Sequence, residues 1–261
     1  VEAPNWGRIP AVAVTGAPVA QADGSVSLAT DAGPLRIAVL ESGVRLRLGP
    51  DTRDYGVLVR EPAPLAVHVE AIDGGTRIVA GKRVLEIGHA PLSFSYAVGG
   101  RRVQSSPTDG HFVRRFRLPP FARMGNSWFV SLELGHDTPV YGLGEKWGRL
   151  DRRGQLVRSF NHDALGVNAE VSYKNAPFAW SPEGWGVFVH TVAPVTHGVG
   201  FAPWSQRAYG LKVDEPALDL FLFDGADGAQ LLGQYTALTG RASVPPLWSL
   251  GLILSKAYYR T

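Results

Sequence analysis

A glycine-rich stretch, VYGLGEKWGRLDRRGQ (residues 140–155), interleaves Gly142, Gly144 and Gly148 with aromatic and charged side chains. The exposed backbone of glycines next to charged side chains could bind a phosphate group. A dinucleotide fingerprint requires G-x-G-x-x-G at the start of a helix, and a P-loop requires Gly-Lys-Ser/Thr. Here the spacing is G-x-G-x-x-x-G, followed by Arg, Leu and Asp without helical periodicity. The spacing argues against phosphate binding and leaves two interpretations: a turn with solvated charges, or a loop that supports a site.

A second polar segment, SFNHDALGVNAEVS (159–172), is too long for a tight hairpin. Loops carry function when a rigid scaffold positions them, so Asp163 is a candidate site residue. The alternative for Asp163 is an Asx-turn or a solvated carboxylate.

The sequence gives little indication of disulfides, metal sites or nucleic-acid binding. The absence of cysteine excludes disulfides and thiolate metal sites. The histidines show no H-x-x-x-H or H-E-x-x-H spacing, so we expect no metal; they are His68, His89, His111, His136, His162, His190 and His197. The net charge is +3 and the basic residues are dispersed, so we expect no nucleic-acid partner.

The elements that must position these residues are strands. Short runs alternate apolar and polar residues, as in LRIAVLESGVRLRL (35–48), and glycine pairs at 74–75 and 99–100 are typical of hairpin turns. Further strands are expected in FVRRFRL, SWFVSLELG, GWGVFVHT and ALDLFLFDG. Alternating strands need a second sheet over their apolar faces, so residues 1–225 are predicted to form a large antiparallel β-sandwich, a mainly β domain.

The pattern changes after residue 225. Leu231, Leu232, Tyr235 and Leu238 share one helical face between a candidate N-cap, Asp227, and a stop at Gly240, which predicts a linker helix within 226–246. LWSLGLILS (247–255) is apolar on both faces, as in a buried parallel strand, with Trp248 in the core. No parallel partner is visible, so the chain looks cut after this strand.

Several motifs in order carry a family resemblance: GLGEKWGRLDRRGQ, SFNHDA, YKNAPF (173–178), GWGVFVHT, QYTALTGR (234–241) and PPLWSLGLILS. Together they resemble glycoside hydrolase family 31, which contains α-glucosidases and α-xylosidases. The resemblance runs from Val140 to Thr261, and GLGEK and LSKAYYRT are nearer the bacterial α-xylosidase-like members. It implies a galactose-mutarotase-like sandwich before a catalytic (β/α)8 barrel, of which residues 247–261 would be the truncated first strand, and no cofactor.

The resemblance assigns roles to a few residues. Both catalytic carboxylates lie later in the barrel, so this chain is expected to hold none and to be inactive alone. The substrate-binding residues are predicted to be Asp163, His162 and Tyr258. Where the family usually has Trp and Thr or Arg, this loop has Phe160 and His162, which bears on leaving-group preference. Loop-anchoring roles are predicted for Glu145 and Lys146, as an ion pair, and for Lys174 and Asn175.

The implied partners are an α-linked oligosaccharide or glycoside and the remainder of the barrel, and a homo-oligomer is compatible. Two alternatives stay open: a free-standing carbohydrate-binding sandwich, and an aldose-epimerase-like enzyme with a His–Glu pair. Trp147, Trp185 and Trp204 fit a sandwich core or a domain interface better than a sugar platform. No window is apolar enough for a membrane span, and without a signal peptide the cytoplasm is the expected location, although a mature secreted chain would look the same.

Overall fold

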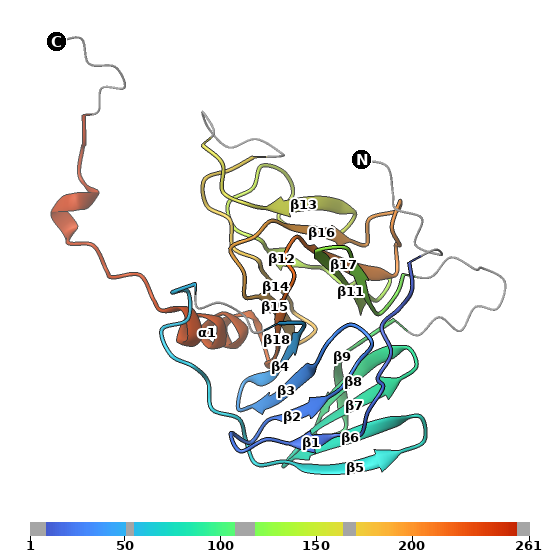
Figure 1. Ribbon diagram of the computed structural model, residues 1–261. Helices are drawn as coiled ribbons and strands as arrows, with labels where there is room; N and C mark the ends of the chain where they lie inside the picture. The colour runs from blue at the N-terminus through green and yellow to red at the C-terminus, as the bar shows by residue number, and fades with distance from the viewer. Residues whose placement is uncertain (1–8, 51–54, 108–117, 164–170, 255–261) are drawn as a thin grey trace.

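The computed structural model describes residues 9–50, 55–107, 118–163 and 171–254. They form three antiparallel sheets and one α-helix (Figure 1). The eight-stranded sheet has the order β1-β2-β3-β4-β18-β15-β14-β12. Its strands are β1 (Val19–Ala20), β2 (Val26–Leu28), β3 (Leu35–Leu40), β4 (Gly43–Leu48), β12 (Tyr141–Gly142), β14 (Phe178–Ser181), β15 (Trp185–Val189) and β18 (Leu218–Asp224).

The two five-stranded sheets have the orders β10-β11-β17-β16-β13 and β5-β6-β7-β8-β9. The first contains β10 (Phe121–Met124), β11 (Ser127–Glu133), β13 (Gln155–Ser159), β16 (Val195–Val199) and β17 (Ala208–Val213). The second contains β5 (His68–Ile72), β6 (Gly75–Ala80), β7 (Arg83–His89), β8 (Leu92–Val98) and β9 (Arg101–Ser105).

The predicted hairpins are confirmed. β3 and β4 pair across the turn before Gly43, and β5 and β6 across Asp73-Gly74. β8 and β9 are joined by Gly99 and Gly100, both of which have positive φ, as a tight hairpin turn requires. The expected strand in FVRRFRL lies almost wholly in 108–117, outside the described residues.

One hydrophobic core joins all three sheets, with members such as Leu35, Leu85 and Leu211. β18 is buried along its whole length because the eight-stranded sheet is covered on both faces. Its residues alternate as the strand period requires: Leu220 and Leu222 enter the shared core, whereas Phe221 and Phe223 pack in a second cluster under the helix.

The helix α1 (Gly228–Thr239) lies where predicted. The Asp227 carboxylate accepts a hydrogen bond from the Gln230 amide at 2.8 Å, and Gly240 ends the helix with φ of 87°. Leu231 and Leu238 are buried against the eight-stranded sheet and Tyr235 stacks on Phe178, as expected. Leu232, which was predicted to share this face, is 49% exposed instead. The sandwich fold class is confirmed, whereas the domain boundaries at 225 and 246 stay predictions.

The strand predicted over 247–255 does not form in the described residues. Leu247–Leu250 make a short 3-10 helix (η2), and residues 251–254 have no regular structure. The segment runs away from the sheets (Figure 1), and Trp248 is 83% exposed rather than buried. A parallel strand needs neighbouring strands for its hydrogen bonds, and no described strand lies beside this one. None of the helices in the described parts of the chain has the length and apolarity to cross a membrane.

Candidate functional site

The glycine-rich segment crosses the backbone of the return segment before β14. The Leu143 amide donates to the Phe178 carbonyl at 2.9 Å, and the Glu145 amide donates to the Lys174 carbonyl at 2.7 Å. Gly142 and Gly144 have φ of 107° and 79°. A Cβ on Gly144 would lie 2.4 Å from the Lys174 carbonyl oxygen, so the bare backbone is needed for close approach to another chain segment.

The charged residues after these glycines serve the turn itself. The Asp151 carboxylate accepts hydrogen bonds from the amides of Val140 (3.1 Å) and Arg153 (3.0 Å). Arg152 is buried and donates to the Arg149 carbonyl at 2.8 Å. Burial lowers the pKa of Arg152. The segment is therefore a turn in which the side chains of Asp151 and Arg152 are bonded internally.

Lys146 joins this turn to both ends of the polar loop. Its Nζ donates to the Arg158 carbonyl at 2.6 Å and to the Ser172 hydroxyl at 3.1 Å. Burial and the nearby Arg152 lower the Lys146 pKa to about 8. The predicted ion pair with Glu145 is not formed in the described structure: Glu145 is exposed and is bonded through its backbone amide.

Asn175 closes the neck of the polar loop. Its side-chain amide donates to the carbonyls of Phe160 (2.9 Å) and Ser172 (3.0 Å) and to the side chain of Asn161 (2.9 Å). The Ser172 hydroxyl, itself buried, donates to Asn175 Oδ1 at 3.2 Å. One side chain thereby ties residues 160–161 to residues 172–175. Lys174, by contrast, is exposed and contributes its carbonyl to the Glu145 contact.

His162 and Asp163 leave this neck exposed to solvent. The His162 amide donates to the Ser172 carbonyl at 3.1 Å, and its ring meets Phe160 edge-on, with centroids 5.0 Å apart. The neck therefore fixes the point from which Asp163 projects. Residues 164–170 and Tyr258 lie outside the described residues, so the third predicted substrate-binding residue has no described position.

The tryptophans divide between core and surface. Trp185 and Trp204 are 3% exposed, which confirms the core prediction for both. Trp204 packs against the bare Cα of Gly198, where a Cβ would lie 2.3 Å from its ring. Trp147 is 71% exposed and so is not a core residue; it lies beside Lys146 on the same turn.

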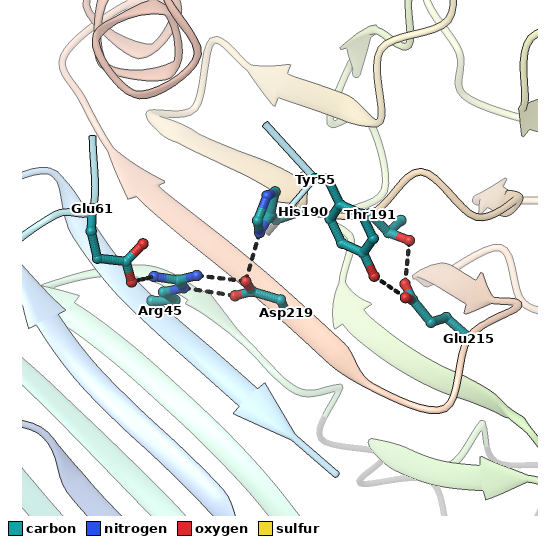
Figure 2. A network of polar contacts seen from close by, with 7 residues as sticks. All are labelled: Arg45, Tyr55, Glu61, His190, Thr191, Glu215 and Asp219. Atoms are coloured by element: carbon teal, nitrogen blue, oxygen red, sulfur yellow. Dashed lines mark hydrogen bonds and ion pairs between the residues drawn. The ribbon is translucent and has the colours of Figure 1, made fainter. Parts of the chain in front are cut away.

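A His–carboxylate pair that the sequence did not predict does occur in the sandwich (Figure 2). His190 Nδ1 lies 2.8 Å from Asp219 Oδ2. Arg45 holds both oxygens of the same carboxylate, at 2.8 and 2.6 Å, and also contacts Glu61. His190, Arg45 and Asp219 are all buried.

Arg45 and His190 both stabilise the charged form of the Asp219 carboxylate. Burial raises the Asp219 pKa, but hydrogen bonds from Arg45 and His190 outweigh it and the pKa is lowered. Beside the network, Glu215 accepts hydrogen bonds from Tyr55 and Thr191, which ties residue 55 to the sheet. A buried carboxylate already engaged by an arginine fits a structural pair rather than the acid and base of an epimerase.

A second buried histidine was also missed. His197 Nδ1 lies 2.7 Å from the Tyr209 hydroxyl on the neighbouring strand, and its Nε2 has no protein partner. Burial, with the charge of Lys146, lowers the His197 pKa to about 3, so the ring is neutral. Its position within the strand run 195–199 was the available signal, because alternate residues of such a strand face the core.

Two further features bear on ligands. No three His, Asp or Glu side chains in the described residues are grouped so as to hold a metal ion. An open cavity of about 360 Å³ is lined by Arg101, Glu183, Asp224 and Gln230, among others. It lies at the Ser181–Trp185 turn of β14 and β15, away from the Phe178 end where the loop neck is. Its Asp224 carboxylate already binds Tyr96 (2.6 Å) and Arg83 (3.2 Å).

Comparison with known proteins agrees with this architecture. The fold is that of a galactose-mutarotase-like sandwich. The family model for the glycosyl hydrolase 31 N-terminal galactose mutarotase-like domain matches residues 34–197. The chain belongs to this family, and the resemblance drawn from its motifs is confirmed.

Individual relatives are much longer than this chain. It is 31% identical over 179 residues to an α-xylosidase of Emericella nidulans, covering 68% of this chain and 21% of that enzyme. It is 34% identical over 127 residues to α-xylosidase XylQ of Lactiplantibacillus pentosus, covering 49% of this chain and 16% of that enzyme. A family 31 dextranase of Flavobacterium johnsoniae shares the fold, with a TM-score of 0.77, 19% identity, and coverage of 93% of this chain and 30% of that one.

Proposed function

We propose that the chain is the amino-terminal region of a retaining α-glycoside hydrolase of the α-xylosidase or α-glucosidase type. In this proposal it packs on a catalytic barrel, supplies one loop of the substrate pocket and holds neither catalytic carboxylate. The supporting observation is its membership of the family over residues 34–197, with relatives that are α-xylosidases and α-glucosidases. The substrate would be an α-linked glycoside, and the reaction would pass through a covalent glycosyl–enzyme intermediate.

Asp163 is the residue proposed to contact the sugar, with His162 beside it. A carboxylate can accept hydrogen bonds from two hydroxyl groups at once, which suits a sugar ring. The neck formed by Asn175, Ser172 and Lys146 supports this role, because it gives an exposed carboxylate a rigid origin. Tyr258 remains a proposed stacking residue.

The exposed apolar residues after Pro246 support packing on a further domain. Leu247, Trp248, Leu252 and Leu254 are all more than four-fifths exposed. Contiguous apolar exposure of this kind marks an interaction surface, and it would make a free-standing sugar-binding module prone to aggregation. We propose that the partner is the remainder of the barrel.

The test uses the full-length enzyme with nitrophenyl α-xyloside and α-glucoside side by side. Asp163→Ala should raise KM or lower kcat without changing Tm. Asp137→Ala provides the control, since Asp137 is an exposed carboxylate on another loop. Unchanged kinetics for Asp163→Ala would overturn the substrate contact. Hydrolysis by residues 1–261 alone would overturn the assignment of catalysis to the barrel.

A further inference from the structure

Three separate chain segments meet at the amino group of Lys146. The lysine belongs to the glycine-rich turn, its first acceptor, Arg158, belongs to β13, and its second, Ser172, belongs to the return of the polar loop. Arg158 and Ser172 stand on either side of the loop that carries His162 and Asp163. A single ammonium group therefore connects the two ends of that loop to a rigid turn.

Ser172 links Lys146 to the exposed residues of the loop. Ser172 accepts from Lys146 through its hydroxyl and accepts from the His162 amide through its carbonyl, at 3.1 Å in each case. Asp163 follows His162 directly. A weaker hydrogen bond between Lys146 and Ser172 would therefore loosen the backbone of His162, which directly precedes Asp163.

The positive charge of Lys146 strengthens these hydrogen bonds but has no counter-ion among the residues that the structure describes. Both acceptors are uncharged, and no ion pair joins Lys146 to a carboxylate in the described residues. The cation Arg152 acts on it, and the charge of Lys146 in turn acts on His197 of β16, which burial keeps neutral. Glu145, next to it in the chain, is exposed. A half-buried ammonium with such neighbours gives up its proton more readily than a solvated lysine.

We propose that Lys146 is a positioning residue that sets the place of the His162–Asp163 loop, and that its hold weakens as the solution becomes alkaline. Hydrogen bonds from an ammonium group are roughly twice as strong as those from a neutral amine, so deprotonation loosens the loop without releasing it. The inference rests on the proposed function, because it takes Asp163 to contact the substrate. The loss of affinity then appears in KM, with kcat little changed.

The test compares wild-type full-length enzyme with K146R, which keeps its charge at all pH values, and with K146Q, which has none. The ratio of the wild-type KM to the K146R KM should rise about fivefold between pH 7 and pH 9.5, the factor that corresponds to ~1 kcal/mol. This ratio cancels the titration of groups elsewhere in the enzyme. K146Q should have the raised KM already at pH 7. K82Q, which alters an exposed turn lysine, is the matched control.

A second measurement separates the inference from the proposed function. Exchange of the His162 amide proton, corrected for the intrinsic pH dependence of exchange, should quicken above pH 8 in wild type and not in K146R. If the amide loosens while every KM stays constant, the positioning inference stands and the substrate contact of Asp163 falls. If K146Q matches wild type at pH 7 in both KM and exchange, the inference is overturned. Should K146Q not fold, the same pH dependence of His162 amide exchange in wild type and in K146R overturns it equally.

Discussion

The side-chain nitrogen of Asn175 lies 2.9 Å from the carbonyl oxygen of Phe160, fifteen residues earlier in the chain. The same nitrogen reaches Asn161 and Ser172, so one amide group holds the two ends of the polar loop together. The exposed candidate residues His162 and Asp163 start from this neck. The hydrogen bonds of one side-chain amide therefore support the site at its base.

Replacing Asn175 by alanine should destabilise the protein by about 1–3 kcal/mol, because backbone carbonyls at the neck lose their donor. The midpoint of urea unfolding measures this change. Lys174→Ala, next to it in the chain, removes an exposed side chain and should leave the midpoint close to wild type. Equal effects of the two substitutions would show that the neck does not depend on the amide.

Two glycines with nearly equal φ separate backbone strain from steric clash. Gly144 has φ of 79° and Gly154 has φ of 80°, so an alanine at either carries the left-handed penalty of about 1–2 kcal/mol. Only at Gly144 would the new Cβ also meet backbone atoms, at 2.4 Å from the Lys174 oxygen; at Gly154 it meets nothing within 4 Å. Gly144→Ala should therefore lower Tm distinctly more than Gly154→Ala. A similar loss in both variants would contradict the close crossing.

The buried pair of Arg45 and Asp219 should be costly to break. Arg45→Met leaves the Asp219 carboxylate buried with only His190 as a partner, and the expected loss is about 3–5 kcal/mol in unfolding free energy. Arg77→Met is the matched control, because Arg77 pairs with Glu70 and Glu86 on the surface and should leave the unfolding midpoint near that of wild type. An Arg45→Met protein as stable as Arg77→Met would refute a stabilising role for the buried pair.

His197 should make the protein sensitive to mild acid. Its pKa in the fold, lowered to about 3 by burial and by Lys146, lies below the ~6.5 of an unfolded chain. Its contribution is therefore complete above pH 6.5 and is lost as the pH falls toward 3, at about 1.4 kcal/mol per pH unit. His197→Gln, which keeps a polar group near Tyr209, should flatten the dependence of unfolding free energy on pH between 6 and 4. Parallel profiles for the two proteins would contradict the neutral buried ring.

The surface and core positions of the tryptophans show where pattern reasoning fails. Trp185 and Trp204 are buried, whereas Trp147 and Trp248 are exposed, although all four follow apolar or glycine-rich sequence. An apolar side chain is buried only where another part of the chain comes to cover it. The sequence near Trp248 indicates a buried strand, yet burial depends on neighbouring strands that are absent from the described residues.

By itself, the sequence determined the features that depend on nearby residues. The alternation of 35–48, the glycine turns at 74 and 99, and the caps of α1 at Asp227 and Gly240 are local preferences, and each is present in the fold. The ordered motifs also identified the family, since they lie in fixed order along the chain. Asn175 could be placed at the return of the loop for the same reason.

Only the tertiary structure decided which distant side chains meet. Arg45 and Asp219 are 174 residues apart and pair because β4 and β18 are neighbours in one sheet. Lys146 contacts Arg158 and Ser172 instead of Glu145 because the turn crosses both loop ends at that point. Strand order and chain crossings arise from packing the whole core, and no periodicity within a short window records them.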